Sequence, residues 1–140
     1  MKAVRTTSLL ILAGMYLFAP GSFAAQEITW SHDFKASLAE AQKDNKLVFV
    51  DMYTDWCGPC KLLDKDTFHD AKFIEVINKG FIPVKLNAEK DGLDVAQAQD
   101  VQAYPTGLVF SSDGKVVKRF VGFLPAAKYA PALKKLSKSK

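Results

Sequence analysis

The sequence predicts an α/β fold in which a mixed central β-sheet is flanked by helices on both faces. Apolar, β-branched segments alternate with segments of helical periodicity, an order typical of parallel strands joined by right-handed crossovers. The dipeptide Asp113-Gly114 separates two further strand-like segments and is a strong hairpin signal. We therefore expect an antiparallel pair beside the parallel strands.

The first half of the chain carries helix caps and one strongly apolar strand. Ser31 or Asp33 can cap the first helix, and Asp70 is placed to cap a later one. The apolar and aromatic composition of residues 47–53 is that of a buried strand. In order, we expect a short strand at 26–30, a helix ended by Asp44-Asn45, the strand at 47–53, a helix from the cysteines interrupted at 67–70, and a helix whose C′ residue is Gly80.

The second half begins with an apolar segment and ends with an amphipathic one. The spacing of Tyr129, Leu133 and Leu136 places them on the inward face of the last helix. In order, we expect a strand at 81–87, a loop at 88–92, a short helix at 93–101, a break at 104–106, strands at 107–111 and 115–121, and a helix at 126–136.

The first 24 residues have the three parts of a secretory signal peptide. Lys2 and Arg5 precede an apolar run, and Ser22-Phe23-Ala24 offers small residues at the −3 and −1 positions of a cleavage site. An uncleaved anchor is the alternative, but the apolar run is about a dozen residues, short of the roughly 20 that span a bilayer. We expect a signal peptide at 1–24, a domain at 25–140, export to the periplasm or beyond, and no integral membrane segment after processing.

Charge and ligand patterns argue against several classes of function. The net charge is +4, and without residues 1–24 the chain has 17 basic and 15 acidic residues, too small an excess to indicate a nucleic-acid partner. A Cys-x-x-Cys pair needs two more ligands to hold zinc, and the only histidines, His32 and His69, are far apart in the sequence. We expect no metal and no organic cofactor.

Cys57 and Cys60 are the only cysteines, and they follow a strand at the start of a helix. A helix N-terminus favours an anion, so Cys57 is the expected thiolate nucleophile. Cys60, about one turn further along, is expected to resolve a mixed disulfide formed at Cys57. A disulfide that closes so short a loop adds little stability, so we expect the pair to have a redox role more than a structural one.

Asp51 is a charge inside the otherwise apolar strand 47–53. Burial raises the pKa of a carboxyl, so a buried Asp51 can accept the Cys60 proton near neutral pH and assist the attack of Cys60. A strand-end aspartate that reaches water is the alternative interpretation.

These residues resemble the thioredoxin family, over roughly residues 30–137. The run Trp56-Cys57-Gly58-Pro59-Cys60-Lys61 is that of thioredoxin, and Asp51 matches the family's buried aspartate. The resemblance implies a thioredoxin fold in which Lys85 lies near Asp51 and Pro105 is a cis-proline. It implies Cys57, Cys60, Asp51 and Lys85 as catalytic residues. The interpretation of Lys85 as a simple surface lysine stays open. The implied docking surface consists of Trp56, Gly58, Pro59, Tyr104, Pro105, Gly122 and Phe123, whose large members can equally serve as packing.

Three features depart from the family pattern. The active-site helix lacks the central proline and is interrupted at 67–70, as in exported thioredoxin-like proteins and the C-terminal domain of transmembrane thiol reductant carriers. Tyr104 precedes the cis-proline, where smaller residues are common. Gly107 replaces a bulky apolar residue in the following strand.

The resemblance implies an exported thiol:disulfide oxidoreductase, a monomer whose only redox group is the Cys57–Cys60 pair. Gly58-Pro59 together with Asp51 favours a reductant of protein disulfides. A reductant in an oxidising compartment must be recharged, so the expected partners are protein thiols or disulfides and a membrane electron donor. The alternatives are an oxidant that introduces disulfides and a binding or assembly module of the same fold.

Overall fold

A four-stranded sheet with the strand order β2-β1-β3-β4 forms the centre of the molecule. The structure is a computed structural model that describes residues 26–139. In it, β1 (Leu47–Tyr53) pairs parallel with β2 (Phe81–Asn87) and antiparallel with β3 (Thr106–Phe110). β4 (Val116–Val121) pairs antiparallel with β3 beyond the predicted hairpin. The predicted mixed sheet is confirmed.

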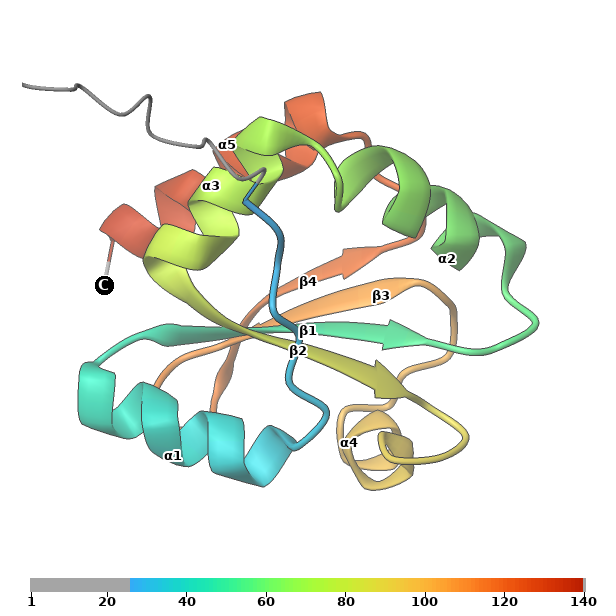
Figure 1. Ribbon diagram of the computed structural model, residues 1–140. Coiled ribbons are helices and arrows are strands. Elements are labelled where there is room, and N and C mark those ends of the chain that lie inside the picture. The colour runs from blue at the N-terminus through green and yellow to red at the C-terminus, as the bar shows by residue number, and fades with distance from the viewer. Residues whose placement is uncertain (1–25, 140) are drawn as a thin grey trace, which may run out of the picture.

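Helices cover both faces of this sheet (Figure 1). On one face, α1 (Phe34–Asp44) and α4 (Leu93–Ala98) pack against Val48, Val50 and Met52 of β1. On the other face, Phe49 of β1 lies in a second core with the π-helix η1 (Leu63–Thr67), α3 (Ala71–Gly80) and α5 (Ala126–Lys138). The short α2 (Gly58–Leu62) leads directly into η1 on this second face. Alternate side chains of β1 therefore serve two cores, which explains why the strand is apolar throughout except at Asp51.

The predicted helix caps position the elements that carry the site. The Asp33 carboxylate accepts the N–H of Ala36 at 2.9 Å, and Asn45 ends α1 in the left-handed conformation at φ 49°. Asp70 accepts the N–H groups of Lys72 and Phe73 at 2.9 and 3.0 Å and so begins α3. Of the two candidates for the first cap, Ser31 and Asp33, the structure uses Asp33, and the Asp70 cap is confirmed.

The prediction of a strand at 26–30 is wrong. Only an isolated parallel bridge between Ser31 and Val84 forms along this edge of β2. Ser31 donates its N–H to the carbonyl of Pro83 at 3.0 Å and accepts the N–H of Lys85 at 2.9 Å. The ladder cannot continue because Pro83 has no N–H to donate to the next residue of a parallel strand.

Several boundaries differ from the prediction by a few residues. Gly80 is the last residue of α3 and not a C′ residue, since its chain continues directly into β2. β3 begins and ends one residue earlier than expected, and α5 continues to Lys138. The helix predicted at 93–101 ends at Ala98, shortly before Asp100 adopts a φ of 48°.

The N-terminal predictions concern residues that the structure does not describe. The signal peptide expected at 1–24 lies outside residues 26–139, as does the first residue of the domain expected at 25–140. Within residues 26–139, no helix has the length and hydropathy needed to cross a membrane.

Candidate active site

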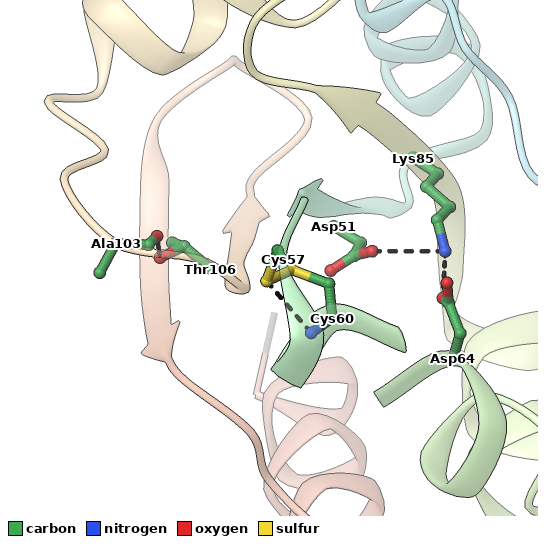
Figure 2. The surroundings of a disulfide bond; sticks show 7 residues. All are labelled: Asp51, Cys57, Cys60, Asp64, Lys85, Ala103 and Thr106. Carbon is green, nitrogen blue, oxygen red and sulfur yellow. Dashed lines mark hydrogen bonds and ion pairs between the residues drawn. A yellow bond between two sulfur atoms is a disulfide. The ribbon is translucent and has the colours of Figure 1, made fainter. Parts of the chain in front are cut away.

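The two cysteines lie at the first turn of α2 and form a disulfide (Figure 2). Their Cα atoms are 5.3 Å apart, and Cys57 is the N-cap residue of the helix. The backbone N–H of Cys60 donates to the Cys57 sulfur at 3.2 Å, the kind of contact that stabilises negative charge on that sulfur in the reduced state. Pro59 occupies the first turn, where a missing N–H costs nothing. Strand, loop and helix thus place a reactive pair where the sequence predicted it.

Asp51 lies beneath this pair and is only 2% exposed. Its side chain points into the space between the disulfide and the ammonium of Lys85 (Figure 2). One carboxyl oxygen is 3.7 Å from Lys85 Nζ, and among residues 26–139 the other oxygen has no hydrogen-bond partner. Burial raises the pKa of Asp51 from its usual 3.8 to about 7, while Lys85 lowers it and the charge of Asp64 raises it. The expected buried acid is therefore present.

The Lys85 side chain is held between two carboxylates and three aromatic rings. It extends from β2 and forms a close ion pair with Asp64 in addition to its longer contact with Asp51. Its ammonium also lies 5.2 to 5.7 Å from the ring centres of Trp30, Tyr53 and Phe68. These contacts leave the Lys85 side chain 15% exposed, so it is not a simple surface lysine.

Asp64 is a site residue that the sequence analysis missed. It belongs to η1 and is the nearer of the two carboxylates to Lys85. A sequence signal was available, because Asp64 follows Cys60 by four residues and so lies on the same side of a continuous helix. Figure 2 shows its carboxylate directed at the Lys85 ammonium from below in this view, while the Asp51 carboxylate approaches from the left. Two carboxylates, Asp51 and Asp64, therefore contact the same ammonium.

The predicted docking residues differ in exposure, since Pro105 is buried and Tyr104 and Gly122 are half-buried. The Tyr104–Pro105 peptide bond is cis, as expected, and Gly122 donates its N–H to the Pro105 carbonyl at 2.8 Å from a φ of 84°. Trp56 is 67% exposed, packs edge-on against Tyr104 at 6.0 Å between ring centres, and donates its indole N–H to Glu89 at 3.0 Å. The remaining docking residues, Gly58, Pro59 and Phe123, are also exposed.

This arrangement is suited to thiol–disulfide exchange. A thiolate at Cys57 can attack a disulfide, Cys60 can displace the product, and Asp51 can hold the proton that Cys60 gives up. Within residues 26–139, no group of three or more His, Cys, Asp or Glu side chains is arranged to hold a metal ion.

Comparisons with known proteins agree with this chemistry. A family model described as a thioredoxin-like domain matches residues 34–137. Thioredoxin-1 of Saccharomyces cerevisiae is 39% identical over 98 residues, covering 68% of this chain and 82% of that protein. The thiol:disulfide interchange protein DsbD of Vibrio vulnificus strain YJ016 is 30% identical over 134 residues, which are 87% of this chain but only 22% of that protein.

Solved structures show the same fold. The solution structure of a thioredoxin from Thermus thermophilus superposes with a TM-score of 0.71 at 20% identity, covering 79% of this chain and 87% of that one. At this level of identity, the similarity concerns the fold alone.

Proposed function

The chain belongs to the thioredoxin-like family of thiol:disulfide oxidoreductases, and from this membership we propose that it reduces protein disulfides outside the cytoplasm. The observation that favours reduction of substrates over their oxidation is the charge balance of the site. Asp51 and Asp64 share the ammonium of Lys85 beside the cysteines. Carboxylates near a thiolate disfavour it, so they make the reduced pair a better electron donor.

The reaction proceeds through one mixed disulfide. The Cys57 thiolate attacks one sulfur of the substrate disulfide, a bond forms between Cys57 and that sulfur, and the other substrate sulfur leaves as a thiolate. Cys60 then passes its proton to Asp51, and its thiolate attacks the Cys57 sulfur. The Cys57–Cys60 disulfide forms, and the substrate leaves as a dithiol after taking up protons from solvent. Two electrons have moved from the cysteine pair to the substrate.

Trp56, Gly58, Pro59, Tyr104, Pro105 and Gly122 form the docking surface in this proposal. The exposed ring of Trp56 and the half-buried ring of Tyr104 supply apolar contact, and the backbone beside the cis-proline offers hydrogen-bonding groups to an extended substrate segment. Such a surface recognises an unfolded or loop region around a disulfide more than a particular sequence.

The oxidised pair must be returned to the dithiol by an electron donor. Outside the cytoplasm no glutathione or thioredoxin pool keeps thiols reduced, so we propose a membrane protein that presents its own dithiol to Cys57. The similarity to DsbD, whose name describes thiol:disulfide interchange, supports a partner of this chemistry. Export rests on the N-terminal sequence and is tested by N-terminal sequencing of the protein recovered from cells.

The equilibrium reduction potential of the Cys57–Cys60 pair, measured against dithiothreitol or glutathione, tests the direction. A value near ~−270 mV supports a reductant, and a value near ~−120 mV indicates an oxidant that introduces disulfides. In an insulin-reduction assay the wild-type protein should turn over and Cys57→Ser should not. Cys60→Ser should accumulate mixed disulfides with its substrates. If Cys57→Ser retained full biological activity, a binding or assembly module would replace the redox proposal.

A further inference from the structure

Gly107 lies directly opposite Asp51 in the antiparallel pairing of β1 and β3. Side chains of residues directly opposite one another project from the same face of a sheet, so a side chain at position 107 would stand beside the Asp51 carboxyl. A Cβ atom built on Gly107 would lie only 1.8 Å from the hydroxyl oxygen of Tyr129. The Tyr129 hydroxyl therefore occupies the space where residue 107 would begin its own side chain. We call this space the Gly107 notch.

Tyr129 reaches the notch from α5 and is fixed there. Its side chain is 1% exposed, and its ring packs against three aromatic residues, Phe49, Phe73 and Phe120, at 4.7 to 5.7 Å between ring centres. Burial and then the charge of Asp51 raise the pKa of Tyr129 well above its usual value of 10.0. The hydroxyl thus stays protonated and can act as a hydrogen-bond donor inside the second core.

The hydroxyl is close enough to serve the Asp51 carboxyl. Opposite Cβ atoms in a sheet are about 5 Å apart, which puts the Tyr129 oxygen within roughly 7 Å of the Asp51 Cβ. A rotation of the Asp51 side chain or one bridging water would join them. The second Asp51 oxygen, which has no hydrogen-bond partner among residues 26–139, is the acceptor that such a donor would satisfy.

We propose that Tyr129, seated in the Gly107 notch, is a positioning residue that supplies a hydroxyl donor to the ionised Asp51 carboxylate and so eases the transfer of the Cys60 proton. This inference rests on the proposed reductase chemistry of the Cys57–Cys60 pair. It also accounts for the glycine at position 107, because any Cβ there would exclude the hydroxyl.

Few other groups can perform this task. The titratable and charged groups that face Asp51 are Lys85 from β2, Asp64 from η1 and, in the reduced protein, the two thiols of α2. The ammonium of Lys85 is already shared with Asp64. On β3 the position opposite Asp51 is the glycine itself. The hydroxyl of Thr54 is also buried and has no hydrogen-bond partner among residues 26–139. Tyr129 is the neutral donor that the β1–β3 register and the Gly107 notch place on the Asp51 side of the sheet.

The variant Tyr129→Phe tests the proposal because it removes the hydroxyl and keeps the ring. Loss of a donor to the charged form should raise the pKa of Asp51, measured in the reduced protein from its carboxyl carbon resonance, by about one unit. The rate of insulin reduction should rise with pH as Asp51 ionises, and we call this rise the acid limb of the pH–rate profile. The acid limb should move to higher pH together with the Asp51 pKa, so the rate should fall about tenfold at pH 6 and by less than about twofold at pH 9. A purely structural role would not shift this limb.

Two controls isolate the effect. Tyr104→Phe deletes a hydroxyl at the docking surface and should leave the Asp51 pKa unchanged. In an Asp51→Asn background, Tyr129→Phe should produce no further shift of the acid limb, because the group that it acts on is gone. A limb that still shifts in that background, or an Asp51 pKa that Tyr129→Phe leaves unchanged, would overturn the proposal.

The test does not depend on turnover or on the stability of one variant. If the wild-type protein failed to reduce insulin, the proposed function would fail, while the Asp51 pKa would still decide the role of Tyr129. If Tyr129→Phe proved poorly folded, the Tyr129 ζ-carbon resonance should still titrate with Asp51 in the wild-type protein and not in Asp51→Asn. If the chemical shift of the Tyr129 ζ-carbon did not change while Asp51 titrates, the inference would be contradicted.

Discussion

Asp64 and Lys85 form an ion pair that joins η1 to β2 beside the buried Asp51. The contact of the same ammonium with Asp51 is longer, at 3.7 Å. Asp64 therefore acts on Asp51 in two ways, since it adds a negative charge nearby and draws the neutralising cation toward itself. Both effects favour the protonated form of Asp51.

Asp64→Asn should lower the pKa of Asp51, because the repelling charge is removed and Lys85 becomes free to pair with Asp51. The acid limb of the insulin-reduction profile should move to lower pH by about half a unit to one unit. The rate at pH 6 should rise about threefold or more, while the rate at pH 9 should change little. The profile should be measured together with the reduction potential, which we expect to become less negative.

Asp66→Asn is the matched control for Asp64→Asn. Asp66 lies on the same π-helix but is exposed, so the substitution makes the same change in net charge away from the buried pair. It should leave the acid limb in place. Equal shifts in both variants would mean that Asp64 acts only through the overall charge of the molecule.

Asp51→Asn should stabilise the folded protein at alkaline pH. The folded pKa of about 7 exceeds the usual 3.8, so between these pH values the native state binds more protons than the unfolded state. Stability of the wild-type protein should therefore fall as pH rises from about 4 to 7, and level off above. The variant lacks this loss, and its advantage should grow with pH toward a limit on the order of 4 kcal/mol. Guanidinium unfolding at pH 4 and pH 8.5 measures the difference in free energy of unfolding between the two proteins. If this free energy depended on pH identically in both, the assignment of Asp51 as a buried acid would be contradicted.

Most of the fold follows from local sequence patterns because the caps and apolar periodicities agree with the packing. Asp33, Asp70 and the hairpin at Asp113-Gly114 each act through neighbours in sequence, so their roles were predictable. The strand expected at 26–30 fails for a reason that local sequence does not contain. Its pairing partner would be Pro83, and the missing N–H matters only once the two segments lie side by side.

The candidate site also contains some features that the sequence predicts and one contact that only the folded chain creates. Cys57, Cys60, Asp51 and Pro105 were predictable from spacing or from the resemblance. The cysteines and Asp51 lie together at one end of the sheet, and Pro105 directly precedes Thr106, which pairs with Met52 beside Asp51. The contact between Gly107 and Tyr129 was not predictable, since these residues lie 22 positions apart and meet only when α5 folds back onto β3. The sequence showed an unusual glycine, and the structure shows the atom that occupies its space.

Tyr104→Ala should impair docking of protein substrates and leave the chemistry intact. Tyr104 packs edge-on against the exposed Trp56, and removing the ring deletes apolar contact beside the cis-proline. An aromatic contact worth about 1 kcal/mol corresponds to a rise of roughly fivefold in KM for insulin with little change in kcat. Reduction of a small aromatic disulfide should be unaffected. Val117→Ala, an exposed apolar residue at the hairpin end of β4, is the control and should leave both parameters unchanged.

Gly107→Ala should destabilise the protein, and Tyr129→Phe should relieve most of that loss. The new Cβ would lie 1.8 Å from the Tyr129 hydroxyl oxygen, so the strand or the ring must move, at a cost of about 1–3 kcal/mol. Phenylalanine removes the hydroxyl and leaves the Cζ atom at 3.2 Å, a contact that a small displacement accommodates. The double-mutant cycle, measured by guanidinium unfolding of the oxidised protein, should give a coupling energy of about 1 kcal/mol or more. Gly58→Ala, whose Cβ would meet nothing within 4 Å, should change stability little, and additive effects of the two core substitutions would show that the hydroxyl does not occupy the notch.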